Sequence, residues 1–371
     1  MKHKLFSVVL FTSSVLFFLY AGGKVSSTAG VTVTIGLAVI VLLFITLGEL
    51  YPWKTFEVET FHSDGEKLSN VGGFTSTTGG GRSFVVHVHT CFSYDSLGKP
   101  HQLEIEALRE GIDKIYTTDH ENDLLAKVYP SDVICAGKEI EDPNYGRLLI
   151  LGNGLKVIAH PNNPKYRFTG KYERDFLYEL IDLKDVIRVA PLWLKFYFLL
   201  RALFIYPLSR RKALDYFPRL IPVDWWAEQY LKNTEGGTLK VIGGLDHHVK
   251  FTFWEKPKKF FSFPAYRDSF YILRNKTLGG KDDIDRAMEE GRFYISLCNT
   301  TIKIENERVE TSHKKTLTVS YYSDGTKKVS FKGYFDPKAA LVVVFRYSSR
   351  LGKFFFGVQP VAVFKPLGKL K

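Results

Sequence analysis

The sequence predicts an α/β protein with two apolar segments before it and a small antiparallel β domain after it. Short β-branched runs alternate with helical patterns between residues 83 and 300, as in a parallel sheet or a barrel. Polar and apolar residues alternate in the strand-like runs after residue 301, which is typical of antiparallel strands. The chain has 371 residues, 45% hydrophobic and 24% charged, so long disorder is excluded and two or three domains are expected.

Two uncharged apolar segments, residues 5–21 and 31–48, lie near the N-terminus. Each is about long enough to cross a hydrocarbon core of roughly 30 Å at 1.5 Å per residue. Lys2 and Lys4 precede the first segment, and the positive-inside tendency would keep that end in the cytoplasm. We therefore expect a transmembrane hairpin over residues 1–50, which makes the chain a multi-pass membrane protein with its main domain in the cytoplasm. A cleaved signal peptide is the alternative for the first segment.

Residues 51–82 are predicted to form a linker, because residues 75–81 are rich in Thr, Ser and Gly. A phosphate-binding loop is disfavoured there, since no strand precedes it and no lysine follows in register. Strands are expected over residues 84–89, 112–117, 133–140, 148–151, 157–159 and 239–243, and a helix over residues 102–110 that ends at Gly111. Residues 301–371 are predicted to form a basic β-sandwich-like domain, with strands over residues 316–322, 328–333 and 340–347 and a turn at residues 323–325.

Histidines and acidic residues lie at the ends of five apolar runs. His87 and His89 are two apart on a predicted strand, so both side chains leave the same face. Two imidazoles on one face favour a metal site, although half-exposed surface histidines are an alternative. The other residues of this kind at strand ends are Asp95, His120, Glu139, His160, Asp246 and His248. Nitrogen and oxygen ligands without thiolates suit Mn, Fe or Zn, so the sequence predicts a site for divalent metal ions.

These motifs together resemble those of the PHP (polymerase and histidinol phosphatase) domain family, over roughly residues 83–300. In chain order they read His-x-His-Thr-x-x-Ser-x-Asp, Thr-Asp-His, Gly-x-Glu, His-Pro and Gly-x-Asp-x-His. The resemblance implies a distorted (β/α)7 barrel that holds two or three metal ions (Mn, Fe or Zn). It also implies hydrolysis of phosphate esters by metal-activated water, with no side chain as nucleophile.

The resemblance further implies which residues bind each ion. One ion would be held by His87, His89, Glu139 and Asp246. Glu139 would bridge to a second ion that also takes His160, and a third would be held by Asp95, His120 and His248. Cys91 lies between ligand positions, but no base accompanies it, so we expect a packed small residue there.

Two residues depart from the family pattern. Arg147 stands where the family usually has a histidine that binds the second ion, and a guanidinium has no lone pair to give. The second ion is then weakly bound or absent, or Arg147 reaches in as a cation and holds a substrate phosphate oxygen. A third interpretation is that Arg147 points to solvent. Leu245 stands where the family usually has serine, and we expect this change to be mild.

Two basic regions bear on the partners of the protein. Residues 192–220, inside a long insertion over about residues 190–230, hold six Lys and Arg and one acidic residue among many aromatic and apolar side chains. We expect an interfacial helix on an anionic lipid surface, with a helix buried in the barrel wall or a groove for a lipid substrate as alternatives. Residues 301–371 hold 14 Lys and Arg against 5 Asp and Glu, but the charges are scattered and nucleic acid is not the expected partner.

The sequence therefore predicts a membrane-anchored, PHP-type metal-dependent phosphoesterase. Its substrate would be a phosphorylated small molecule or a lipid headgroup. Two alternatives stay open: a metal-dependent hydrolase of a non-phosphate bond, and a non-catalytic binding or scaffold protein whose metal cluster is partly degraded.

Overall fold

The centre of the molecule is a closed barrel of seven strands. The computed structural model describes residues 28–57, 81–166, 168–253, 262–280, 282–305 and 307–366. The barrel closes because β2 pairs with both β3 and β8. Its strands are β2 (Ser83–Val88), β3 (Lys114–His120), β4 (Ile134–Asp142), β5 (Gly146–Ile150), β6 (Lys156–Ile158), β7 (Leu177–Asp182) and β8 (Lys240–His247).

The barrel mixes parallel and antiparallel pairs. Strands β2 to β4 are parallel to one another, as are β6 to β8, and β8 is parallel to β2. Strand β5 is antiparallel to both β4 and β6, and no helix separates these three strands. The predicted α/β class and a barrel are thus confirmed, but a regular (β/α)7 alternation is not seen, because β4, β5 and β6 follow one another through turns.

The predicted strands of the barrel are all present, and their sequences explain why they are buried. Every residue of β2 is buried, as expected for a β-branched run covered on both faces. Helix α3 (Pro100–Glu110) ends as predicted at Gly111, which takes the left-handed conformation at φ 64°. Strand β7 was not predicted, because its sequence Leu-Tyr-Glu-Leu-Ile-Asp carries two acidic residues, Glu179 and Asp182, and both are buried.

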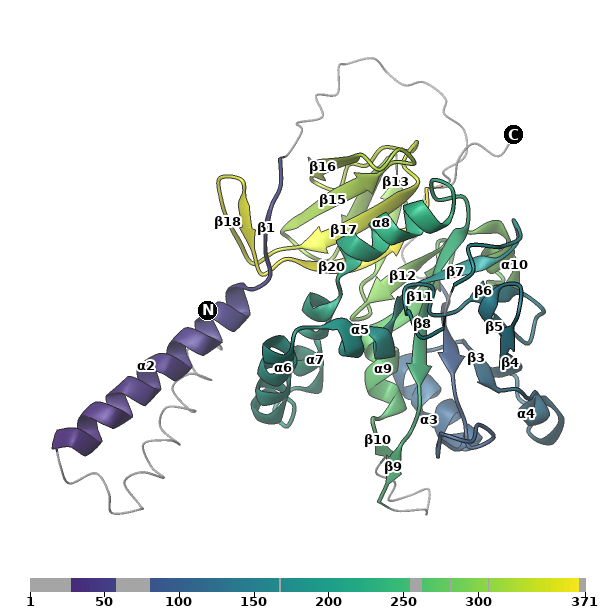
Figure 1. Cartoon of the computed structure of the whole chain (residues 1–371), viewed down its shortest axis with the longest axis horizontal. Helices are drawn as coiled ribbons and strands as arrows, with labels where there is room; N and C mark the ends of the chain where they lie inside the picture. The colour runs from purple at the N-terminus through teal and green to yellow at the C-terminus, as the bar shows by residue number, and fades with distance from the viewer. Residues whose placement is uncertain are drawn as a thin grey trace.

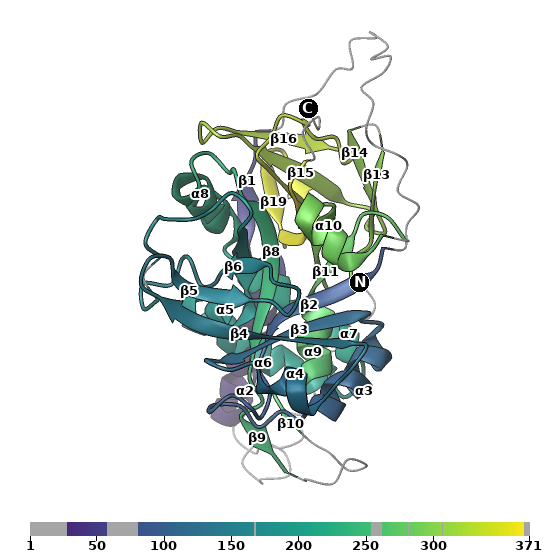
Figure 2. The same cartoon turned by 90° about the vertical axis from the view of Figure 1, so that its right-hand side faces the viewer.

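Helices cover the barrel at several points (Figure 1, Figure 2). They are α4 (Leu124–Val128), α5 (Leu183–Val189), α8 (Val223–Asn233), α9 (Tyr266–Ile272) and α10 (Ile284–Glu290). A short hairpin of β9 (Phe251–Thr252) and β10 (Ser262–Phe263) precedes α9. In α8, Trp226 is buried and Trp225 is 43% exposed, so one of the two tryptophans is a core residue.

An antiparallel sheet continues from the barrel through the C-terminal part of the chain. In order from β2, its strands are β11 (Leu273–Thr277), β12 (Phe293–Leu297), β20 (Gln359–Phe364), β17 (Leu341–Arg346), β15 (Thr316–Tyr321) and β16 (Lys327–Phe331). A separate pair is formed by β13 (Ile302–Glu305) and β14 (Arg308–Thr311). The C-terminal antiparallel strands are as predicted, and the sheet runs through the predicted boundary at residue 300 because β12 pairs with both β11 and β20.

Part of the predicted linker is a strand. Strand β1 (Trp53–Thr55) pairs with β19 (Phe354–Phe356), which in turn pairs with β18 (Ser349–Leu351). Phe56 follows β1 and is buried against Phe355, with ring centroids 5.4 Å apart. Residues 58–80, with most of the Thr/Ser/Gly-rich stretch, lie outside the described residues.

The prediction of two membrane spans, and with it a multi-pass membrane location, is contradicted. The first predicted span, residues 5–21, lies outside the described residues. The second, residues 31–48, falls in α2 (Thr28–Leu50). Among the helices that the structure describes, none combines the length and the apolar character needed to cross a bilayer.

The end of α2 is used for packing against the protein instead. Tyr197 donates its hydroxyl hydrogen bond to the carbonyl of Ile45 at 3.3 Å, and Arg219 Nη1 donates to the carbonyl of Glu49 at 2.6 Å. Phe44 packs edge-on against Tyr197 at 5.3 Å between ring centroids. The helical stretch before Phe44, residues 28–43, is about 24 Å long at 1.5 Å per residue, shorter than a hydrocarbon core of roughly 30 Å.

The insertion forms α6 (Leu192–Ile205), α7 (Arg210–Leu214) and the short helix η1 (Phe217–Leu220). Helix α6 buries Leu194 and Tyr197 but leaves Leu192, Phe196 and Leu203 at least 59% exposed. The alternative of a helix buried in the barrel wall is therefore wrong. An anionic lipid surface as the partner of this helix stays a prediction.

Arg274 ties the first strand beyond the barrel to two helices, and its loss should destabilise the fold. Its buried guanidinium donates to the carbonyls of Glu110 at 2.7 Å and Phe270 at 2.9 Å and lies 3.6 Å from the Glu110 carboxylate. Arg274→Leu should lower the free energy of unfolding by about 3 kcal/mol, because it removes the donor to two buried carbonyls and leaves Arg210 as the remaining cation beside the Glu110 carboxylate. Urea denaturation measures this. The exposed ion pair of Arg286 with Glu290 offers the control, and Arg286→Leu should change little. Equal effects of the two substitutions would contradict this account.

Candidate metal centre

The barrel brings the predicted site residues to one edge. Strands β2, β3, β4 and β8 are parallel neighbours, so their carboxyl ends meet there. His87, His160 and Asp246 have positive φ angles of 61°, 50° and 41°, a region that non-glycine residues rarely adopt. The pairing of β2 with β3 and β8 shifts register around His87. Unusual backbone at three predicted ligands is typical of functional sites.

One oxygen of each of two buried carboxylates faces a group of imidazoles. Glu139 Oε2 lies 3.4 Å from His87 Nε2, 3.2 Å from His89 Nε2 and 3.3 Å from His120 Nδ1. Asp246 Oδ1 lies 3.6 Å from His87 Nε2 and 3.4 Å from His89 Nε2. The four residues that were predicted to share the first ion are thus gathered around one point.

A second group of donors lies beside the first. Asp95 Oδ1 is 3.6 Å from His120 Nε2, and Asp95 Oδ2 is 3.0 Å from His248 Nε2. The His89 and His248 rings stack with centroids 4.0 Å apart, which joins this group to the first. One donor atom each of His89, Asp95, His120 and His248 lie within 4.8 Å of one another.

Several of these buried atoms have no hydrogen-bond partner among the described residues. They are His87 Nε2, His89 Nε2, Glu139 Oε2, Asp95 Oδ1 and His248 Nε2. Buried polar atoms are normally paired, and these five belong instead to the two neighbouring groups of possible metal ligands. Imidazole nitrogens and carboxylate oxygens without thiolates fit a divalent cation such as Mn, Fe or Zn. The buried His, Asp and Glu groups are therefore positioned to hold a metal ion.

Two carboxylates that the sequence analysis missed orient the histidines. His87 Nδ1 lies 2.7 Å from Glu179 Oε1, and His160 Nδ1 lies 3.1 Å from Asp185 Oδ2. Because a carboxylate only accepts, each imidazole donates from Nδ1, which leaves Nε2 as the ring nitrogen that could bind a metal ion in place of a proton. His87, His160, Glu179 and Asp182 also form a third group of donor atoms within 4.8 Å. The only signal for them in the sequence is acidic residues inside an otherwise apolar run.

The electrostatics of the cluster favour cations. Burial alone would raise the pKa of Glu139, but the close imidazoles of His87 and His89 and their charges hold it well below its usual range. Burial alone would lower the pKa of His87, but the charges of Glu179 and Asp246 raise it well above its usual range. Glu139 therefore stays ionised, as does Asp246, whose pKa is also held well below its usual range by the neighbouring histidines despite burial, and the two draw positive charge to this point.

Two cationic side chains take the remaining oxygens of the carboxylates. Arg147 Nε lies 3.4 Å from Glu139 Oε1, and its guanidinium lies over the Tyr166 ring at 5.0 Å from the centroid. Lys184 Nζ lies 2.8 Å from Asp246 Oδ2. His160 Nε2 faces the same two oxygens, at 3.9 Å and 3.5 Å. The interpretation that Arg147 points to solvent is wrong, because its side chain is only 16% exposed and faces the cluster.

The other two residues singled out in the sequence lie near the centre without joining it. Leu245, which stands where the family pattern has serine, is buried in the barrel, in agreement with the expectation that this change is mild. The expectation that Cys91 is a packed residue is wrong, because it is exposed. Partial burial of its thiol and the charge of Asp119 raise the thiol pKa, which disfavours a thiolate. Comparison of the chain with protein-family models and with curated proteins gave no match. The resemblance to the PHP family therefore stays a prediction that depends on the motifs and on this geometry.

Neighbouring histidines offer a matched test of metal binding. His248 faces Asp95, whereas His247 Nδ1 pairs with Ser269 Oγ at 2.6 Å and its ring packs on Tyr266. The protein incubated with Mn²⁺ or Zn²⁺ and desalted should retain metal, measured by inductively coupled plasma mass spectrometry. The His248→Gln variant should retain about one equivalent of metal less than the wild type, because one ligand is missing from a small set of donors. His247→Gln should keep the wild-type content, and equal contents in the two variants would show that the ions bind elsewhere.

Proposed function

We propose that this chain is a PHP-type, metal-dependent phosphoesterase that hydrolyses a phosphate ester of a small molecule. The observation that carries the proposal is that the two oxygens of each buried carboxylate face different partners. Their inner oxygens, Glu139 Oε2 and Asp246 Oδ1, face imidazoles, and their outer oxygens face Arg147 and Lys184. Metal ligands beside fixed cations suit a substrate group that carries several negative oxygens.

We propose that the centre holds two ions. His87, His89, Glu139 and Asp246 would hold one, and Asp95, His120 and His248 would hold the other. When bound, such ions activate a water molecule and neutralise the charge of the phosphoryl group. A distorted PHP-type barrel, with His-bearing strand ends at one edge, is the finer fold that we propose to accompany this function.

The residues of the chain itself would bind and orient the substrate. Arg147 and Lys184 stand where the family pattern places a second ion with His160, and we propose that their two charges replace that ion. A guanidinium can hold two phosphate oxygens through parallel hydrogen bonds. Tyr166 fixes the Arg147 plane, since the guanidinium and the His160 ring both pack against it. Glu179 and Asp185 keep the imidazoles in one orientation while substrate exchanges.

The assay uses a simple monoester and a simple diester. With Mn²⁺, Zn²⁺ or Fe²⁺, the full chain should hydrolyse p-nitrophenyl phosphate or bis(p-nitrophenyl) phosphate. Asp246→Asn should lower kcat by at least about a hundredfold, because a carboxylate shared by the histidines is lost. Cys91→Ser should retain full activity. A wild-type protein that binds metal yet hydrolyses neither compound would contradict the phosphoesterase proposal and favour a non-phosphate hydrolase or a binding protein.

Substitution of Arg147 separates substrate binding from metal binding. Arg147→Met should raise KM about tenfold, as expected for loss of a charge-assisted hydrogen bond, and leave the metal content unchanged. Arg147→His should instead raise the metal content by one equivalent, because it supplies the imidazole that the family pattern has there. Metal analysis and steady-state kinetics of both variants measure this. Loss of bound metal in Arg147→Met would show that the arginine supports the ligands rather than the substrate.

A further inference from the structure

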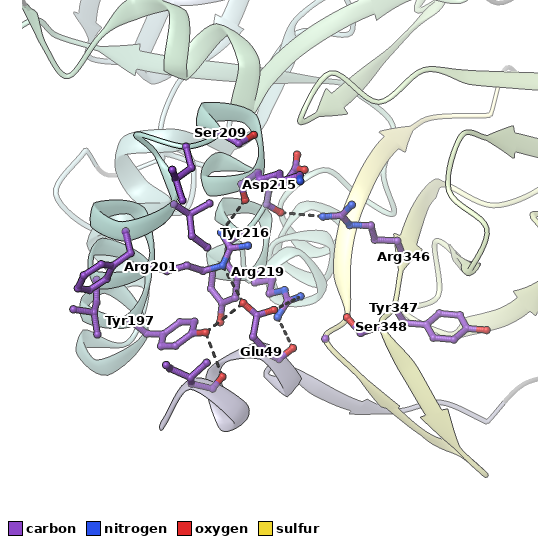
Figure 3. A pocket seen from close by; sticks show the side chains of 17 residues that line it. Glu49, Tyr197, Arg201, Ser209, Asp215, Tyr216, Arg219, Arg346, Tyr347 and Ser348 are labelled. Carbon is purple, nitrogen blue, oxygen red and sulfur yellow. Dashed lines mark hydrogen bonds and ion pairs between the residues drawn. The ribbon is translucent and has the colours of Figure 1, made fainter. Parts of the chain in front are cut away.

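A cavity of about 630 Å³ lies between α2, α6, α7, η1 and β17 (Figure 3). None of the residues that line it is a candidate metal ligand. Its volume is in the range of sites that hold small organic molecules. The metal-dependent activity proposed above gives it no role.

One side of this cavity is apolar. Its wall includes Ile45 of α2 and Leu200, Phe204 and Ile205 of α6. The apolar surface continues outward along α6, where Leu199 and Leu203 are 61% and 68% exposed. A chain of methylene groups that enters the cavity would therefore find apolar contacts along α6.

The other side is cationic, with four basic residues against two carboxylates, Glu49 and Asp215. Arg201 and Arg219 are occupied by Glu49 and by main-chain carbonyls. Lys212 is exposed, and its ammonium group forms no hydrogen bond or ion pair with the described residues. Arg346 donates from Nη2 to the carbonyl of Asp215 at 3.1 Å, and Figure 3 shows it reaching from β17 toward Asp215.

The four basic residues and two carboxylates leave the lining with a net charge of +2. Glu49 pairs with both Arg201 and Arg219, and Asp215 accepts the Tyr271 hydroxyl at 2.6 Å, so Lys212 and Arg346 are the cations that Glu49 does not pair with. Two cations opposite an apolar wall recognise a ligand with an anionic head and an alkyl tail. A phosphate monoester suits this pair because it carries up to two negative charges and several acceptor oxygens.

We propose that this cavity binds a single-chain alkyl phosphate, with its head at Lys212 and Arg346 and its chain along the apolar wall of α6. The site is independent of the proposed hydrolytic activity. The head chemistry is shared by a free phosphate and by a lipid phosphate, and the probes below distinguish them.

Isothermal titration calorimetry on the full-length Asp246→Ala protein tests the proposal, because that background prevents turnover of the probe. Dodecyl phosphate, below its critical micelle concentration, should bind with one-to-one stoichiometry. Butyl phosphate should bind at least a hundredfold more weakly, because each buried methylene adds about three- to fourfold in affinity. Inorganic phosphate and the neutral dodecyl maltoside should bind weakly or not at all. Equal affinity for inorganic phosphate, or for the maltoside, would overturn the proposal.

Paired variants locate the head and the tail. The double variant Lys212→Gln/Arg346→Gln should bind dodecyl phosphate at least tenfold more weakly. The control Lys232→Gln/Lys314→Gln removes the same charge from exposed positions outside the cavity and should stay within twofold of wild type. In the Phe204→Ser variant, affinity should depend less on the length of the alkyl chain but should still depend on the charge of the head group. Equal losses in the charge variant and its control would show non-specific attraction to a basic protein and overturn the proposal.

Discussion

The two buried carboxylates Glu139 and Asp246 impose the constraint on which the rest of the barrel edge depends. A carboxylate in the interior of a barrel is costly unless positive charge or hydrogen-bond donors surround it. Here imidazoles take one oxygen of each, and Arg147 and Lys184 take the other. These donors must be held at one point. The unusual backbone at the strand ends and the carboxylates that orient the histidines both serve this need.

The motifs predicted the centre well because each ligand lies at the end of an apolar run, and parallel strands bring such ends together. Glu179 and Asp185 could not be predicted in this way, since they reach the cluster from β7 and α5 without a motif. The role of Arg147 could not be predicted either, because the spacing of residues in the sequence does not give the distance between its guanidinium and Glu139. The antiparallel orientation of β5 could not be predicted, because a short apolar run does not show whether its strand is parallel or antiparallel to its neighbours.

Apolar runs in the sequence proved less informative outside the barrel. Residues 31–48 suggested a membrane span, but the end of α2 packs on Tyr197 and accepts from Arg219. Helix α6 suggested an interface or a buried helix, and it forms one wall of a cavity while it exposes its other apolar residues. A run of apolar residues specifies burial against something, and only the three-dimensional contacts of its few polar residues show what that is. The two sites of the molecule thus draw on different parts of the chain.

X-ray diffraction from crystals grown with Zn²⁺ or Mn²⁺, recorded on both sides of the metal absorption edge, tests the central claim most directly. The account predicts two anomalous peaks, one among His87, His89, Glu139 and Asp246 and one among Asp95, His120 and His248. It also predicts that the position between His160 and the outer oxygens of Glu139 and Asp246 is held by Arg147 and Lys184. A single ion at that position, or no peak within the cluster, would contradict it.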